Sequence, residues 1–212
     1  MKLFNYWRSS SSYRVRLALH FKGVPFEYVP VSLLKGEQHE AAHRGRNPAG
    51  SVPVLEVNED GRVVELAQSV AIFEYLEERY PERPLLPASP TGRAQVRAIT
   101  ELINSGIQPF HNLATLNHLK AIGADEKAWA RHFIDQGLKT LDALAERHAG
   151  RFLFGDTFTW ADCCLVPQLY GARRFGGDVA AFPRLTRIEQ ASLELAHVQA
   201  ARPEAQPDAQ PA

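Results

Sequence analysis

Residues 7–19 read WRSSSSYRVRLAL, and they place four consecutive serines directly before an apolar helical pattern. The preceding residues 2–6, KLFNY, predict a short first strand. The apolar positions from Ser12 to Phe21 suit one side of a helix, and Gly23 is a typical helix end. The row of hydroxyls therefore lies at the first strand-to-helix turn, where free N–H groups and the helix dipole favour an anion.

One serine at a helix start most often caps the helix, but four hydroxyls exceed what capping needs. A free thiol has a pKa of about 8.5, and lowering it by about two units requires roughly 2.7 kcal/mol of preferential thiolate stabilisation. A hydroxyl hydrogen bond together with a helix terminus is of that order. The stretch is therefore suited to hold the sulfur of a bound thiol.

Composition limits the function classes. The chain has 212 residues, with 45% hydrophobic and 23% charged side chains, which is typical of a folded protein of one large or two small domains. Lys+Arg and Asp+Glu balance at 24 each, so no general attraction to nucleic acid or a membrane surface is expected. No membrane span or signal peptide is predicted, and the adjacent Cys163 and Cys164 argue against a disulfide framework. These features predict a cytoplasmic protein.

The first 80 residues have the element order of a thioredoxin-like domain. After the first helix, residues 26–31 predict a strand and the polar residues up to Asn47 predict an irregular stretch. Two short strands follow, from Val52 and from Arg62, joined by a turn at residues 58–61. A helix then begins at Gln68-Ser69 and ends near Tyr80.

The rest of the chain reads as helical. Residues 81–90 contain four prolines and predict a linker. Helices are expected over about 93–120, 126–148, 160–175 and 185–200, and the polar, Pro-rich last ten residues are expected to be frayed. The predicted fold class is α/β plus all-α, with a thioredoxin-like domain at 1–80, the linker at 81–90 and an all-helical domain at 91–212.

Five motifs together resemble zeta-class glutathione transferases: WRSSSSYRVRLAL, NPAGSVPVL, AQSVAIFEYLEERYP, IQPFHNL and FGDTFTWADCCLVPQLYGARRF. The resemblance covers essentially the whole chain. The class includes maleylacetoacetate isomerase, and maleylpyruvate isomerase is a near relative. The resemblance implies the glutathione transferase fold, glutathione as a cofactor bound by the first domain, a small dicarboxylate or keto-acid substrate, and a homodimer.

The resemblance also implies a set of glutathione contacts. Ser9 or Ser10 would bind the thiolate, and Ser11 stands where the class commonly has a cysteine. A cis Val52-Pro53 bond would turn the Val52 backbone toward the cysteinyl unit, in the manner of an added strand. The remaining contacts are Gln68 and Ser69 for the γ-glutamyl end, Gln38 for the glycyl end, and Gln108, His111 and Asn112 as polar contacts from the helical domain.

Arginines are expected to recognise the substrate. By resemblance, Arg8 and Arg174 hold its carboxylates with forked hydrogen bonds. Arg14 and Arg16 are expected to serve a domain or subunit interface. Asp162 follows Thr159 at the spacing of a helix cap, so we assign it to structure rather than to catalysis.

The predicted function is glutathione-dependent isomerisation of maleylacetoacetate to fumarylacetoacetate in tyrosine and phenylalanine breakdown, with Arg8, Arg174 and the serines at 9–11 as catalytic residues. Leu113 and Ala114 stand where the maleylpyruvate relative has arginines, which favours maleylacetoacetate. The alternatives are a maleylpyruvate isomerase, a general zeta-class transferase or dehalogenase, and a non-enzymatic transferase-like binding module. The reaction needs no metal, and the spacing of His and Cys offers no metal site.

Overall fold

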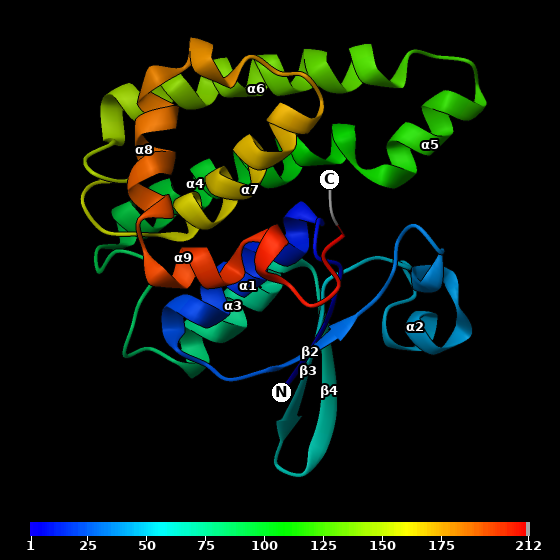
Figure 1. Cartoon of the computed structure of the whole chain (residues 1–212). Helices are drawn as coiled ribbons and strands as arrows, with labels where there is room; N and C mark the ends of the chain where they lie inside the picture. Colours follow the sequence, from blue (N-terminus) through cyan, green and yellow to red (C-terminus); the bar gives the residue numbers. More distant parts are fainter. Residues whose placement is uncertain (211–212) are drawn as a thin grey trace. The chain divides into compact units, whose positions relative to one another are not determined.

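A mixed β-sheet forms the centre of the first structural unit (Figure 1). In the computed structural model, which describes residues 1–210, the sheet has four strands in the order β2-β1-β3-β4. They are β1 (Lys2–Asn5), β2 (Glu27–Pro30), β3 (Val54–Glu59) and β4 (Arg62–Ala67). The strand β1 pairs in parallel with β2 and antiparallel with β3.

The β3–β4 hairpin follows from its turn residues. Asp60 and Gly61 lie between the strands with φ of 51° and 80°. A two-residue hairpin loop with positive φ at both positions favours Asp-Gly, and its twist matches that of the flanking strands. The predicted turn at residues 58–61 is therefore present.

The first unit also contains helices. They are α1 (Ser10–Lys22), α2 (Ala41–Arg46), α3 (Ser69–Arg79) and α9 (Ala196–Ala201), with the short 3₁₀ segments η1 (Glu37–His39) and η4 (Pro203–Ala205). Figure 1 shows α1 and α3 side by side over the sheet, and α9 packs on α1. The helix α1 ends at Gly23, which adopts the left-handed conformation with φ of 70°. The thioredoxin-like prediction is confirmed.

The second unit, Leu85–Glu194, is built from helices. They are α4 (Pro90–Gly106), α5 (Leu113–Ala121), α6 (Glu126–His148), α7 (Trp160–Arg174) and α8 (Pro183–Leu193), with η2 (Gln108–His111) and η3 (Val179–Ala181) between them. The helix α7 is central, since nearly all its residues are buried and it packs against α4 and α8. This confirms the expected all-helical part of the fold.

Some predicted elements are divided. The helix expected over 93–120 is interrupted after Gly106 by η2. Pro109 explains the break, because proline lacks an N–H and its ring clashes with the preceding turn. The helix expected over 185–200 is divided into α8 and α9, and the stretch expected to be irregular before Asn47 contains η1 and α2.

The C-terminal segment corrects one expectation. Residues 203–210 were expected to be frayed, but the Gln206 side-chain amide donates to the carbonyls of Ala200 at 2.9 Å and Arg202 at 2.7 Å. Asp208 accepts a hydrogen bond from the backbone N–H of Trp7. From Leu195 onward the chain groups with the first unit, whereas we expected 91–212 to form one domain. Residues 211–212 of the expected frayed end lie outside the described residues.

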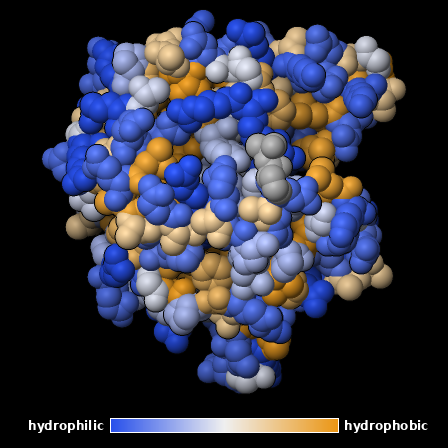
Figure 2. Space-filling model, in the orientation of Figure 1, coloured by the Kyte–Doolittle hydropathy of each residue, from blue (hydrophilic) through white to orange (hydrophobic). Residues whose placement is uncertain are grey.

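The surface carries scattered apolar residues. On the face shown in Figure 2, hydrophilic residues predominate and apolar residues form small separate patches. Exposed apolar residues of this kind are normal in folded proteins. Within residues 1–210, no helix combines the length and the apolar character needed to cross a membrane.

Candidate active site

Ser9 is the N-cap of α1, and its hydroxyl oxygen accepts a hydrogen bond from the Ser12 N–H at 3.2 Å. A hydroxyl that accepts one hydrogen bond keeps its own proton to donate, so Ser9 can cap the helix and also bind a thiolate. Ser10 and Ser11 lie half-buried in the first turn. Ser12 is fully buried, and its hydroxyl accepts from the Tyr6 N–H at 3.5 Å. Ser12, the fourth serine, therefore stabilises the turn through this hydrogen bond.

Val52 precedes β3. The Val52-Pro53 peptide bond is cis, and the pairing of β3 with its neighbours begins at Val54, so Val52 lies beyond the paired register. Its side chain packs in one apolar cluster with Tyr6 and Trp7, the two residues that lead into the serine turn. Val52 therefore shares an apolar cluster with residues that precede α1.

The start of α3 is held by α1. Ser69 is buried, and its hydroxyl accepts a hydrogen bond from Arg14 Nη1 at 3.3 Å. The preceding residue, Gln68, has φ of 74° and ψ of 119°. Such a conformation in a residue other than glycine costs on the order of 1–3 kcal/mol and is concentrated at ligand-binding positions. The Arg14–Ser69 bond brings the N-terminal parts of two helices to the same end of the unit.

Gln38 presents a buried acceptor. Its side chain is buried, with Nε2 at 3.1 Å from His39 Nε2, and its Oε1 has no hydrogen-bond partner within residues 1–210. The segment packs against Gly50, where a Cβ would come within 3.2 Å of the Gln38 carbonyl oxygen. Because buried acceptors are normally satisfied, the amide oxygen is suited to receive an N–H from a bound molecule.

The candidate residues of the second unit have local partners. His111 is buried, and its Nε2 lies 3.2 Å from Gln168 Oε1. Asn112 Oδ1 accepts from the Ala114 N–H at 3.0 Å and so caps α5. Gln108 is half-buried and begins η2. Of these three residues, Asn112 thus caps a helix, and His111 is buried and hydrogen-bonded.

The arginine pair at the end of α7 divides into two roles. Arg173 donates from Nη1 to Glu189 Oε1 at 2.6 Å and from Nη2 to the other carboxylate oxygen, so it joins α7 to α8. Arg174 is exposed, and its guanidinium carbon lies 5.6 Å from the Phe175 ring centroid. Arg173 is thus part of an ion pair within the second unit, while the role of Arg174 at the substrate stays a prediction from the resemblance.

Arg8 belongs to the first unit. It is half-buried, and its guanidinium carbon lies 5.2 Å from the Trp7 ring centroid. It forms no ion pair with a carboxylate of the described residues. A cation directly before the Ser9 turn, without a protein counter-ion, is suited to an anionic ligand.

Arg14 and Arg16 are fully buried charged residues of α1. Their expected role at a domain or subunit interface stays a prediction. Arg14 bonds to Ser69, and Arg16 bonds to the backbone of the serine turn through the Trp7 carbonyl at 2.8 Å. The sequence signal is a pair of arginines two positions apart in an otherwise apolar helix. An arginine that is buried in such a helix requires hydrogen-bond partners.

Comparisons with known proteins identify the family. The model described as "Glutathione S-transferase, N-terminal domain" matches residues 1–78, and that described as "Glutathione S-transferase, C-terminal domain" matches residues 127–191. A zeta-class glutathione S-transferase of Euphorbia esula is 44% identical over 98% of this chain and 92% of that protein. The chain belongs to the zeta-class glutathione transferase family.

Other similar proteins are isomerases. Maleylpyruvate isomerase of Ralstonia sp is 44% identical over 98% of this chain and 99% of that protein. Maleylacetoacetate isomerase of Anaeromyxobacter dehalogenans 2CP-1 is similar in structure, with a TM-score of 0.92 and 53% identity over 99% of this chain and 97% of that chain. That protein has been solved with glutathione in its active site, and also with dicarboxyethyl glutathione and citrate.

The zeta-class assignment agrees with the grouping of residues in the first unit. The N-terminal family model spans the serine turn, Gln38, Val52 and Ser69. These residues are joined by the Tyr6–Trp7–Val52 cluster, the close approach at Gly50 and the Arg14–Ser69 hydrogen bond. All of these residues therefore lie within the part of the chain that the N-terminal family model matches.

Proposed function

We propose that this chain converts maleylacetoacetate to fumarylacetoacetate. It is a glutathione-dependent cis-trans isomerase of the glutathione transferase superfamily, and glutathione is its cofactor. The observation that carries the proposal is the Ser9 turn at the N-terminus of α1. This turn offers a hydroxyl proton and free helical N–H groups to a sulfur anion.

The residues of the first unit fit glutathione. The Ser9 hydroxyl would bind the sulfur, and the Val52 backbone, which lies beyond the β3 pairing, would bind the cysteinyl peptide group. The buried Gln38 Oε1 is a hydrogen-bond acceptor that suits the peptide N–H at the glycyl end. Gln68 and Ser69, at the N-terminus of α3, suit the carboxylate of the γ-glutamyl end.

The chain's own residues then supply charge and orientation. When bound, glutathione supplies a thiolate that adds reversibly to the cis double bond, so that rotation about the resulting single bond gives the trans product. Ser9 and the α1 terminus stabilise the negative sulfur before addition and after its release. Arg8 and Arg174 bind the substrate carboxylates and stabilise the negative charge that develops on the substrate.

Two observations favour this substrate over the alternatives. Leu113 and Ala114 begin α5 and carry no charge, which favours maleylacetoacetate over the maleylpyruvate taken by a 44% identical relative. Arg8 lies without a carboxylate partner in the described residues, and such a charge suits an anionic substrate better than the apolar acceptors of a general transferase or dehalogenase.

We also propose that the chain acts as a homodimer in the cytoplasm. Transferases of this kind pair the small domain of one subunit with the helices of the other. Light scattering at micromolar concentration should give twice the chain mass of 23.7 kDa, and a monomer would contradict the dimer.

The test is a direct assay of the purified protein with maleylacetoacetate, maleylpyruvate and a neutral chlorinated aromatic. We expect isomerisation that requires glutathione, with kcat/KM for maleylacetoacetate at least about tenfold above that for maleylpyruvate, equivalent to about 1.4 kcal/mol. Equal or reversed selectivity would contradict the proposed substrate. Conjugation of the aromatic without isomerisation would contradict the isomerase function.

A further inference from the structure

The peptide groups of Trp7 are held by two side chains of opposite charge. The Trp7 N–H donates to Asp208 Oδ2 at 3.2 Å, and the Trp7 carbonyl accepts from Arg16 Nη2 at 2.8 Å. The anionic Asp208 therefore faces the N–H donor, and the cationic Arg16 faces the carbonyl acceptor. In both hydrogen bonds the charge attracts the group that it faces. Charge-assisted hydrogen bonds of this kind are stronger than those between neutral groups.

The peptide groups of Tyr6 are also bonded. Its carbonyl accepts from the Ser9 N–H at 3.0 Å and from Arg16 Nη1 at 3.4 Å. Its N–H donates to the buried Ser12 hydroxyl. All four backbone polar groups of the two residues that lead into the serine turn are thus satisfied, and Arg16 binds both carbonyls.

Arg16 also reaches the C-terminal segment. Its side chain is fully buried, and its Nε donates to the Ala201 carbonyl at 3.0 Å while Nη1 donates to Asn5 Oδ1 at 2.9 Å. One guanidinium therefore joins the end of β1, the serine turn and the end of α9. A rigid planar fork of donors is required for this geometry, and lysine does not provide it.

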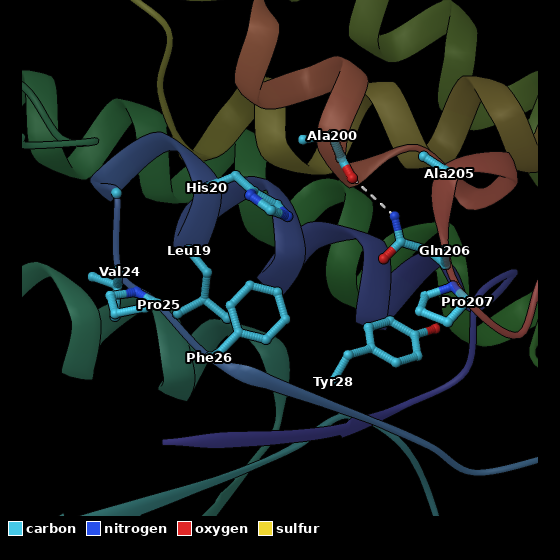
Figure 3. A pocket seen from close by; sticks show the side chains of 11 residues that line it. Leu19, His20, Val24, Pro25, Phe26, Tyr28, Ala200, Ala205, Gln206 and Pro207 are labelled. Carbon is cyan, nitrogen blue, oxygen red and sulfur yellow. Dashed lines mark hydrogen bonds between the residues drawn. The ribbon is translucent and has the colours of Figure 1, made fainter.

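Asp208 is held in place from the other side. The Tyr28 hydroxyl donates a short hydrogen bond to Asp208 Oδ1, and Ala209 packs against the apolar cluster that contains Trp7. Burial, and after it the bond to Asp208, raises the pKa of the Tyr28 phenol above its ordinary value, so the hydroxyl stays a donor. Figure 3 shows the Tyr28 ring directed toward the C-terminal segment at Pro207.

We propose that Arg16 and Asp208 are positioning residues that clamp Trp7 and thereby fix the Ser9 hydroxyl for thiolate binding. The inference rests on the proposed role of the Ser9 turn. It assigns a function to the C-terminal segment, which supplies Asp208 to Trp7 from 201 residues away in the chain and the Ala201 carbonyl to Arg16 from 185 residues away. Donors that stabilise a charge act through their fixed orientation, so a looser turn would bind the thiolate less well.

The test uses Asp208, because removing the buried Arg16 would leave several groups unsatisfied and could unfold the chain. Asp208→Ala removes the acceptor of both hydrogen bonds. Asp208→Asn keeps the shape of the side chain but removes its negative charge, and its single amide oxygen cannot replace both carboxylate oxygens as acceptors from Trp7 and Tyr28. Glu204→Gln is the matched control, since Glu204 is an exposed acid on the same segment and, within residues 1–210, forms an ion pair only with Arg202, at 3.7 Å. Each variant removes one negative charge.

Three measurements separate positioning from simple stabilisation. Amide hydrogen exchange over residues 4–12 of the glutathione-free protein should become about tenfold faster in both Asp208 variants and stay unchanged in Glu204→Gln. The pKa of bound glutathione, followed by thiolate absorbance, should rise by about half a unit or more. At a pH below the wild-type value of that pKa, kcat should fall while KM for the substrate changes little.

The outcomes are distinguishable from those of the proposed function. Unchanged exchange in both Asp208 variants would overturn the clamp. Faster exchange with an unchanged thiol pKa and kcat would show that the clamp only stabilises the fold, and this would overturn the positioning role. A wild-type protein that neither binds glutathione nor isomerises would contradict the proposed function, while the exchange data would still decide whether Asp208 holds the turn.

Discussion

Asp162 accepts a hydrogen bond at 2.8 Å from the backbone N–H of Leu153, which belongs to the loop before α7. Its other carboxylate oxygen accepts from the Thr159 N–H at 2.8 Å and from the Thr159 hydroxyl at 3.0 Å. Burial raises the pKa of Asp162 to about 6, as in some catalytic acids. All of these bonds are made to the chain itself, so the geometry gives Asp162 the structural role expected from its spacing after Thr159.

Asp162→Ala should therefore destabilise the fold strongly. The substitution leaves buried donors at Leu153 and Thr159 without an acceptor, and each costs about 1–3 kcal/mol, so we expect a loss of about 3 kcal/mol or more in urea unfolding. The control is Asp125→Ala at the exposed N-cap of α6, where two N–H groups lose their acceptor in water and about 1 kcal/mol is expected. Equal losses for both variants would contradict this role.

The same pair shows how far the sequence alone can predict the fold. The cap from Thr159 to Asp162 could be predicted because both residues lie in one turn at a fixed spacing. The bond to Leu153 could not, because it depends on the path of a loop that has no periodic pattern. The division at Pro109 was visible in the sequence but was outweighed by the apolar periodicity on either side.

Ser9→Ala should raise the pKa of bound glutathione more than Ser10→Ala or Ser11→Ala. Ser9 is the N-cap, and its hydroxyl is oriented by the Ser12 N–H. We expect a rise of about half a unit or more, since loss of a hydrogen bond to an anion costs at least about 0.7 kcal/mol. Thiolate absorbance as a function of pH measures this value. A rise in Ser10→Ala or Ser11→Ala alone would move the role to that serine.

Ser9→Ala should also lower the free energy of unfolding by about 1 kcal/mol, because the α1 cap is lost. Ser9→Gly is the informative partner, since glycine is well tolerated at an N-cap and has no side-chain donor. It should restore stability without restoring the thiol pKa. Recovery of both properties would show that only the helix terminus acts on the sulfur.

The stability of the first unit should fall in mild acid because of His197. Burial, and then the charges of Arg83 and His20, lower the pKa of His197 from 6.5 to about 4. Between these values the unfolded chain binds a proton that the folded chain does not, so acid favours unfolding. The contribution of His197 to the free energy of unfolding is complete above pH 6.5, and it is lost as the pH falls toward 4. Because the ring is only half-buried, screening limits the effect to about 1 kcal/mol.

His197→Gln tests this dependence. Glutamine cannot take up the proton, so the difference in urea unfolding free energy between pH 7 and pH 5 should be smaller than in the wild type. His118→Gln, at an exposed position on α5, should keep the wild-type difference. If the two variants behave alike, the acid sensitivity comes from groups other than His197.

The candidate site was predictable in part for a physical reason. A residue at a helix start, such as Ser9, carries a local signal in its capping chemistry. Arg16 and Asp208 carry none, because their function depends on the C-terminal segment packing on α1 far along the chain. The polar, Pro-rich composition of that segment indicated a frayed end, whereas Gln206 and Asp208 fix it through side-chain bonds to the backbone.

Arg174→Ala should separate substrate recognition from glutathione binding. Arg174 is exposed at the end of α7 and packs near Phe175, so its removal should leave the melting temperature and glutathione affinity nearly unchanged. Charged hydrogen bonds contribute about 1.5–3 kcal/mol, so kcat/KM for maleylacetone, a shorter substrate mimic, should fall about tenfold or more. Turnover of a neutral chlorinated aromatic should not fall in parallel, because that acceptor has no carboxylate.

The neighbouring Arg173 is the matched control for this prediction. Arg173→Ala removes the same charge one residue away but breaks the paired bonds to the buried carboxylate of Glu189. We therefore expect a lower melting temperature with an unchanged ratio of kcat/KM between maleylacetone and the aromatic, because the loss affects the fold and not the substrate. If Arg174→Ala lowers both activities equally, or neither, Arg174 does not bind the carboxylate, and the main chemical reason for preferring an isomerase over a general transferase is removed.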